Sequence, residues 1–274
     1  MKNLKIALSL IFIFAFTFTS CKKDDEEPVK IYDHMVKKIK YSGGDMVEFH
    51  YDDMKRITKI VYDGKSVNEI MPQAIEPFKT KLEFFYKDND KIFDAAKLYI
   101  EDMLIDSAYV YIKENDIVTE IYNKNDKKEW KKTGQVIYSR NASELITNAT
   151  TSAIDDKGDL VITSLKEFEY KDLNIKKVKE DTYENGMKKD VIVHEIEHGN
   201  ILNPFYDYPF VAFFIRTPDL ASKFNHTKVV VKENDKKTKE VMFEVKADDH
   251  NYVKHITVIE GDSKREVEFI YTDH

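Results

Sequence analysis

The chain has 274 residues, a formal net charge of −7 and a single cysteine. Electrostatic attraction to phosphate backbones or anionic lipid requires a basic surface, so this composition argues against a nucleic-acid partner and against docking on charged membranes. One cysteine excludes an internal disulfide. Hydrophobic residues make up 42% of the chain and aromatic residues 12%, which is enough to build the core of a folded domain.

The first twenty residues have the organisation of a secretory signal peptide. Lys2 and Lys5 form a positive start, and residues 6–18 form an apolar run. Such a run is too short to span a bilayer but has the length of a signal peptide. We therefore expect residues 1–20 to be removed. The loss of Lys2 and Lys5 lowers the formal charge by two, from −7 to −9.

Cys21 follows Phe18-Thr19-Ser20, and this stretch resembles a bacterial lipobox. In that motif the cysteine becomes the lipidated first residue of the mature chain, and its acyl chains anchor the protein to a membrane. An ordinary signal peptide followed by a chance cysteine is the alternative. Residues 21–36 are then a lipidated cysteine and a flexible charged tether.

A run of charges follows Cys21 directly. A charge run is commonly a solvated tether. Lysine followed by acidic residues at this position also resembles the surface-export signal of Bacteroidota-type lipoproteins. The resemblance implies an outer-membrane protein that faces the cell exterior and has the lipoprotein export machinery as a partner. The residues that carry it are Lys23, Asp24, Asp25, Glu26 and Glu27.

The clearest structural unit of the chain is residues 47–60. Val47, Phe49 and Tyr51 alternate with polar residues, which places the apolar side chains on one face of a strand. An acidic turn follows, and Ile57 begins a returning strand, so the unit is predicted to be a β-hairpin.

Similar units recur to the end of the chain. A lone hairpin is marginal in water, so each unit needs its neighbours to cover its aromatic face. A ligand-binding platform is the alternative use for these aromatics, but inward strand positions are normally packed. Five phenylalanines are therefore predicted to point into a shared core: Phe49, Phe84, Phe168, Phe243 and Phe269.

These units resemble degenerate tyrosine–aspartate (YD) repeats of the Rhs type. The fuller resemblance is to a family of anchored lipoproteins of unknown function that carry such repeats, and it covers most of residues 37–274. Asn203-Pro204-Phe205 and Leu220-Ala221-Ser222-Lys223 are similar to the C-terminal half of that family, as are the strands at Phe243 and Phe269. The resemblance supplies no catalytic residues. Most units here lack the glycine usual in YD turns.

Residues 37–274 are accordingly predicted to form a single all-β domain. The expected fold is an antiparallel meander of hairpins, as an open barrel or sandwich, with at most one or two short helices. Residues 94–107 are compatible with a helix, but strands are favoured, and residues 66–80 are predicted to be a loop. Residues 210–215 are predicted to be a short helix that plugs one end of the sheet. An exposed docking patch is the rival interpretation.

His194-Glu195-Ile196-Glu197-His198 matches the H-E-x-x-H pattern of zinc hydrolases. On a helix, the two histidines can chelate zinc and the glutamate can act as general base. The preceding residues 191–193 are β-branched and Gly199 follows, so a strand is predicted instead. Residues four apart in a strand are separated by about 13 Å, whereas zinc lies about 2 Å from its ligands. We therefore expect no metal at His194, Glu195 and His198.

Two further features bear on function. Trp130 is the only tryptophan; it could stack on a sugar, although a cross-strand pair is the more common use. Asp106-Ser107-Ala108 resembles a bacterial O-glycosylation signal. The sequence thus predicts a non-enzymatic lipoprotein without cofactors, acting as a binding or scaffold module for an unknown ligand, either glycan or protein. A glycan-binding accessory protein and a zinc-dependent hydrolase are the alternatives.

Overall fold

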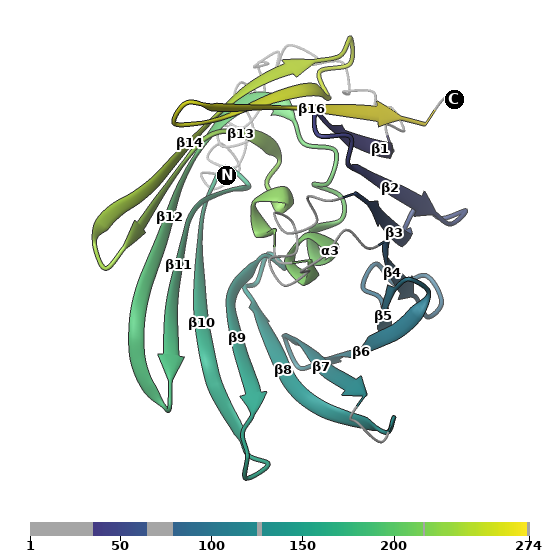
Figure 1. Cartoon of the computed structure of the whole chain (residues 1–274), viewed down its shortest axis with the longest axis vertical. Helices are drawn as coiled ribbons and strands as arrows, with labels where there is room; N and C mark the ends of the chain where they lie inside the picture. The colour runs from purple at the N-terminus through teal and green to yellow at the C-terminus, as the bar shows by residue number, and fades with distance from the viewer. Residues whose placement is uncertain (1–34, 65–78, 125–127, 216, 273–274) are drawn as a thin grey trace, which may run out of the picture. The chain divides into compact units, whose positions relative to one another are not determined.

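The computed structural model describes residues 35–64, 79–124, 128–215 and 217–272, which belong to the compact unit His34–His274. Cys21, the charge run behind it and most of the predicted loop 66–80 lie outside these residues. Within them, sixteen strands form one closed antiparallel barrel in chain order (Figure 1). The strands are β1 (Val36–Tyr41), β2 (Met46–Tyr51), β3 (Ile57–Asp63), β4 (Thr80–Phe85), β5 (Ala95–Ile100), β6 (Met103–Lys113), β7 (Asp116–Lys124), β8 (Trp130–Arg140), β9 (Ile146–Ile154), β10 (Leu160–Lys171), β11 (Asn174–Glu184), β12 (Met187–Leu202), β13 (Phe224–Glu233), β14 (Lys236–Ala247), β15 (Val253–Glu260) and β16 (Ser263–Tyr271).

The antiparallel meander is as predicted, but the open barrel or sandwich was wrong, because the first and last strands pair. Ile39 lies opposite Phe269 and Tyr41 opposite Val267 in the β1–β16 ladder. Closure leaves no strand with an unpaired edge. Val36 is buried and begins β1.

The alternation seen in the sequence defines an apolar inner face. Phe49, Phe84, Phe168 and Phe269 are buried in one hydrophobic cluster, and Phe243 is partly buried against it. The prediction of a shared phenylalanine core is therefore confirmed. The strands favoured for residues 94–107 are also confirmed, as β5 and β6.

Two of the repeat units depart from the predicted pattern. In the unit around Val110, this valine points inward while Tyr109 and Tyr111 are exposed, so its aromatic residues face solvent. In the unit after Phe84, Ile92 does not start the return strand. It belongs to a longer connection that also carries the buried Phe93.

The repeat tyrosines have a structural role at the strand ends. Each is one of the last two residues of an even-numbered strand or directly follows it, and its hydroxyl donates a hydrogen bond to the carbonyl oxygen of the first residue of the preceding strand. Burial raises the pKa of all four phenols, so the hydroxyls remain protonated donors. The bonds are Tyr51 to Val36 (2.9 Å), Tyr86 to Ile57 (2.8 Å), Tyr170 to Ile146 (2.8 Å) and Tyr271 to Val253 (2.5 Å).

Four acidic or amide side chains build a common turn. In each, Oδ1 accepts hydrogen bonds from the backbone N–H groups two and four residues ahead. The residue three ahead has a positive φ, and only one of the four is glycine. The turns start at Asp52, Asn141, Asp155 and Asp248, with the positive φ at Lys55 (62°), Glu144 (60°), Gly158 (90°) and Asn251 (64°).

The long connection between β12 and β13, residues 203–223, folds into the barrel, and we call it the plug. It contains α3 (Pro209–Phe214) and the 3-10 turn η1 (Pro218–Ala221). The predicted helix is thus present, but it lies inside the ring of strands and not merely over one end (Figure 1). Asn203 holds the base of the plug by donating from Nδ2 to the carbonyl oxygens of Leu220 (2.8 Å) and Ser222 (3.0 Å).

Candidate functional site: an apolar cavity inside the barrel

A barrel of sixteen strands is too wide for wall side chains alone to fill, so its lumen must be plugged, hollow or both. Here it is both. The plug fills part of the lumen, and a cavity of about 520 Å³ lies beside it. This volume is within the range of about 300–1,000 Å³ typical of small-molecule sites.

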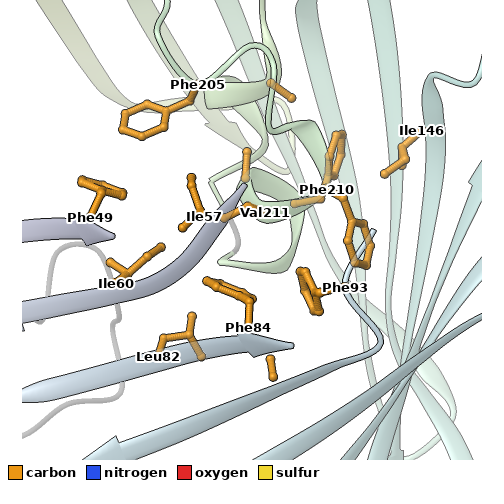
Figure 2. Close-up of a cluster of buried hydrophobic side chains, with 14 of the residues drawn as sticks. Phe49, Ile57, Ile60, Leu82, Phe84, Phe93, Ile146, Phe205, Phe210 and Val211 are labelled. Atoms are coloured by element: carbon orange, nitrogen blue, oxygen red, sulfur yellow. The ribbon is translucent and has the colours of Figure 1, made fainter. Parts of the chain in front are cut away.

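Helix α3 has two faces with different roles. Phe213 and Phe214 follow Phe210 by three and four residues, so all three lie on the face that packs on the wall. Phe210 lies 4.9 Å from Phe93 and Phe213 lies 4.9 Å from Phe168, measured between ring centroids. Figure 2 shows this packed side, with Phe84 and Phe93 next to Phe210.

The other face of α3 borders the cavity. Val211, Ala212 and Ile215 line it, together with Phe205 and Tyr208 from the segment before the helix. The Tyr208 hydroxyl donates to the carbonyl oxygen of Lys55 at 2.8 Å, which ties the plug to the turn between β2 and β3. The plug therefore forms one side of the cavity, held in place by hydrogen bonds and by the aromatic contacts on its opposite face.

The wall of the cavity comes from the two ends of the chain. Inward-facing positions of β1–β3 and β13–β16 line it, and most of them are aliphatic or aromatic. Phe49 of the wall packs against Phe205 of the plug, with the two ring centroids 5.1 Å apart. The wall residues are Ile39, Tyr41, Val47, Phe49, Ile57, Tyr62, His226, Lys239, Val241, Phe243, Ile256, Val258, Glu260, Arg265, Val267 and Phe269.

Among the described residues, three charged side chains line the cavity: Lys239, Glu260 and Arg265. Nζ of Lys239 is 2.9 Å from one Glu260 carboxylate oxygen, and a guanidinium nitrogen of Arg265 is 3.7 Å from the other. Two cations thus share one carboxylate. The three side chains are 46%, 38% and 36% exposed, so the cavity meets solvent at this cluster.

The H-E-x-x-H stretch is a strand, as predicted. His194 lies opposite Val178 and Val231 in the flanking ladders, and His198 lies opposite His226. The helix on which such a zinc site depends is not formed. Over the residues described, no group of three or more histidine, cysteine, aspartate or glutamate side chains has the arrangement of a metal site.

Trp130 lies opposite Lys124 in the β7–β8 ladder, with the Lys124 ammonium 5.2 Å from its ring centroid. The cross-strand pair predicted for this tryptophan is therefore present, although the ring remains partly exposed. Tyr109 and Tyr122 form an aromatic pair on the outer face of β6 and β7, with centroids 5.5 Å apart. These aromatic side chains provide the exposed surface that the glycan-binding alternative requires.

Ser107 of the O-glycosylation-like stretch is in the middle of β6 and only 6% exposed. It lies between Lys97 of β5 and Tyr122 of β7. A sugar attached to the folded chain at Ser107 would have to displace these neighbours. The fold thus offers little access at this position.

The outer face of the barrel is charged around its circumference. Lysine and glutamate side chains pair across or along neighbouring strands on the face opposite the apolar one. The pairs include Lys38–Glu48 (3.6 Å), Lys40–Glu268 (3.7 Å), Lys81–Glu83 (3.3 Å), Lys132–Glu120 (2.7 Å), Lys179–Glu167 (3.6 Å), Lys228–Glu197 (3.8 Å) and Lys232–Glu195 (2.6 Å). In the part of the chain that the structure covers, no helix has the length and apolar character to cross a bilayer.

No protein-family model and no curated protein matches this sequence. Among solved structures, the chain is similar to a porin-like protein from Bacteroides vulgatus, with 11% identity, a TM-score of 0.41, and 88% of this chain and 100% of that chain covered. It is also similar to a porin-like protein from Bacteroides uniformis, with 13% identity, a TM-score of 0.40, and 86% and 98% covered. At these values the two likenesses say nothing about what this chain binds.

The cavity could not be located by inspecting the sequence for motifs. Among the described residues, its charged cluster comes from β14, β15 and β16, and none of these residues is part of a recognisable pattern. The one available signal was the excess of inward apolar positions at Val241, Val258 and Val267, which also describes an ordinary core.

Proposed function

We propose that this protein is an outer-membrane lipoprotein of the Bacteroidota type that acts as a non-enzymatic binding module, with the cavity beside the plug as its ligand site. The observation that carries the proposal is the cavity itself. It is mostly apolar, of ligand size, and bounded by the plug and the wall. A pocket formed in advance needs no ordering of the protein when a ligand enters.

The charged outer wall indicates how such a protein is attached to a membrane. Transmembrane barrels present an apolar band about 25 Å tall to lipid, and a lysine or arginine at the bilayer midplane costs about 2–4 kcal/mol. Ion pairs such as Lys38–Glu48 and Lys232–Glu195 recur around this barrel. We therefore infer that the barrel is hydrated on its outside and is held at the membrane by lipid on Cys21.

Ligand binding can be tested with N-phenyl-naphthylamine, an apolar dye that fluoresces when it leaves water. The protein is the chain from residue 21 onward with Cys21→Ser, so that neither lipid nor detergent competes for the cavity. Val258→Trp adds bulk on a residue that lines the cavity and should abolish binding. Ile259→Trp makes the same change on the neighbouring outward residue and should leave binding intact. If the dye binds neither the parent nor the Ile259→Trp protein, or if the two variants bind equally, the cavity is not a ligand site.

Outward display rests on the charge run at residues 23–27. Together with Lys22, the run has four carboxylates against two lysines and is repelled by anionic lipid, so any effect of the run must come from recognition by export machinery. Alanine at all five positions should leave lipidation intact but keep the domain on the periplasmic side. Protease shaving of intact cells, with a lysed-cell control for intrinsic resistance, measures this. Equal digestion of wild type and variant would refute the sorting role.

A glycan-binding accessory function is a second candidate, favoured by the exposed aromatic side chains of β6–β8. Tyr109 and Trp130 are 54% and 41% exposed, which leaves ring surface available for stacking on sugars. A glycan array with wild type, Tyr109→Ala and Trp130→Ala tests it. If both variants lose a glycan-binding signal that the wild type gives, this surface is favoured over the cavity as the binding site.

A further inference from the structure

One buried tyrosine in the wall of the cavity differs from the other tyrosines of the lumen in its hydrogen bonding. Tyr62 lines the cavity from β3 and is only 3% exposed. Its hydroxyl makes no hydrogen bond with the residues that the structure describes. Side-chain polar groups buried this deeply are nearly always hydrogen-bonded, so each exception calls for an explanation.

The repeat tyrosines show that the barrel does not use Tyr62 as it uses them. Their hydroxyls each donate to a strand-start carbonyl oxygen, at 2.5–2.9 Å. Tyr208 on the plug likewise donates to the carbonyl oxygen of Lys55. Tyr62 is near the end of an odd-numbered strand and does not belong to this series. The strand-end bonds that the repeat tyrosines provide therefore do not account for its hydroxyl.

Tyr62 is also separate from the charged cluster of the cavity. Pairing across the strands leads from Tyr62 through Val47 and Ile39 to Phe269 of β16. Arg265 of the charged cluster is four residues from Phe269 on that strand, which is about 13 Å. The Tyr62 position is thus three strands away from β16 and displaced along the strands as well.

The chemistry at Tyr62 restricts what can bind there. Burial raises the pKa of the Tyr62 phenol, so the hydroxyl stays protonated and can donate a hydrogen bond. Most of the surrounding lining is aliphatic or aromatic. A carboxylate or an ammonium group at this place would lose its water in exchange for one neutral hydrogen bond, which is a costly burial of charge. A neutral oxygen loses less hydration and can accept from the phenol.

We propose that the cavity binds a neutral, mainly apolar molecule with a carbonyl oxygen, which accepts a hydrogen bond from the Tyr62 hydroxyl. This inference rests on the proposed function, because it specifies what the same cavity binds. Burial of the apolar body supplies the affinity. Tyr62 fixes the orientation of the ligand and selects it over a hydrocarbon of the same shape.

The test uses three naphthalenes that differ in one substituent: 2-acetylnaphthalene, 2-ethylnaphthalene and 2-naphthoate. Each displaces N-phenyl-naphthylamine from the chain that starts at residue 21 with Cys21→Ser, after the affinity of every variant for the dye has been measured. Tyr62→Phe should weaken binding of the ketone about five- to tenfold, the effect of one neutral hydrogen bond, and leave binding of the hydrocarbon unchanged. 2-Naphthoate should bind the parent protein most weakly of the three.

Tyr111→Phe is the matched control, because it removes the same hydroxyl group from the outer face of β6 and should change binding of no probe. Urea unfolding of the protein without ligand is a second readout. Tyr62→Phe should not lower the stability, because it removes a buried hydroxyl that no described residue binds. A loss as large as that caused by Tyr170→Phe, which removes a bonded hydroxyl, would show that Tyr62 is bonded within the fold and would overturn the proposal.

Failure of this inference is distinguishable from failure of the proposed function. If no probe displaces the dye, the proposed function itself fails. If 2-ethylnaphthalene binds and Tyr62→Phe weakens neither it nor the ketone, water satisfies the hydroxyl and the carbonyl contact is refuted. The contact is equally refuted if Tyr62→Phe weakens both probes alike, or if 2-naphthoate binds as tightly as the ketone.

Discussion

The two adjacent phenylalanines of β4 provide a direct test of the inner and outer faces of the barrel. Phe84 is 4% exposed, and its ring centroid lies 4.7 Å from that of Phe93 and 5.9 Å from that of Phe214 on the plug. Phe85, the next residue, is 42% exposed and has the Lys97 ammonium 4.9 Å over its ring. The same substitution at the two positions therefore removes a core contact in one case and a surface contact in the other.

The expected costs differ by several kcal/mol. Phe84→Ala removes a fully packed ring and leaves a cavity between wall and plug, which costs about 3–5 kcal/mol. Phe85→Ala removes a cation–π contact at an exposed site, which is about 0.5–1 kcal/mol. For a domain of this size each kcal/mol lowers the melting temperature by about 2–4 °C, so Phe84→Ala should lower it by roughly 6–20 °C.

Urea unfolding followed by circular dichroism measures both variants, and the slope of the transition checks that the unfolded states are comparable. All samples carry Cys21→Ser. Equal destabilisation by the two substitutions would show that Phe84 does not hold the plug to the wall. A larger effect of Phe85→Ala would show that the inner and outer faces are assigned the wrong way round.

Four other outcomes are expected. Tyr170→Phe should cost about 1–3 kcal/mol in urea unfolding, because it leaves a strand-start carbonyl without its buried donor, whereas Tyr111→Phe, on an exposed hydroxyl, should be neutral. Cys21→Ser should abolish incorporation of radiolabelled fatty acid and membrane association, and retention of both would refute lipidation. Elemental analysis should find no stoichiometric zinc, and one equivalent of zinc that His194→Ala removes would overturn the assignment of that stretch as a plain strand. Burial raises the pKa of Asp106, and its Oδ1 lacks a hydrogen-bond partner among the described residues. The ionised carboxylate therefore costs stability at neutral pH, and this cost disappears as the pH falls below the unfolded pKa of about 3.9. Asp106→Asn should accordingly stabilise the protein at pH 7 and have little effect near about pH 3, and the same effect at both pH values would contradict this reasoning.

The local structure of this protein was largely determined by the alternation of its residues. Val47, Phe49 and Tyr51 predicted an inward apolar face, and the β-branched residues before His194 predicted a strand despite the H-E-x-x-H pattern. Both predictions are confirmed, because strand alternation and the preference of β-branched residues for strands depend on only a few neighbouring residues. The tyrosine spacing was also recognisable, but its purpose was not. That Tyr51 donates to Val36 depends on strand register, which sequence spacing leaves open.

The tertiary structure alone decided the closure of the barrel and the existence of the cavity. Closure needs β1 and β16 to pair, and no local pattern in either strand specifies a partner more than two hundred residues away. The two faces of α3 were not assignable either, since Phe210 and Val211 are equally apolar, and only the surrounding strands make one a packed residue and the other a cavity wall. Lys239, Glu260 and Arg265 likewise look like ordinary strand charges in the sequence. They form a cluster because three different strands bring them to the same face of a curved sheet, and side-chain proximity across strands is set by register and closure, which are global properties of the fold.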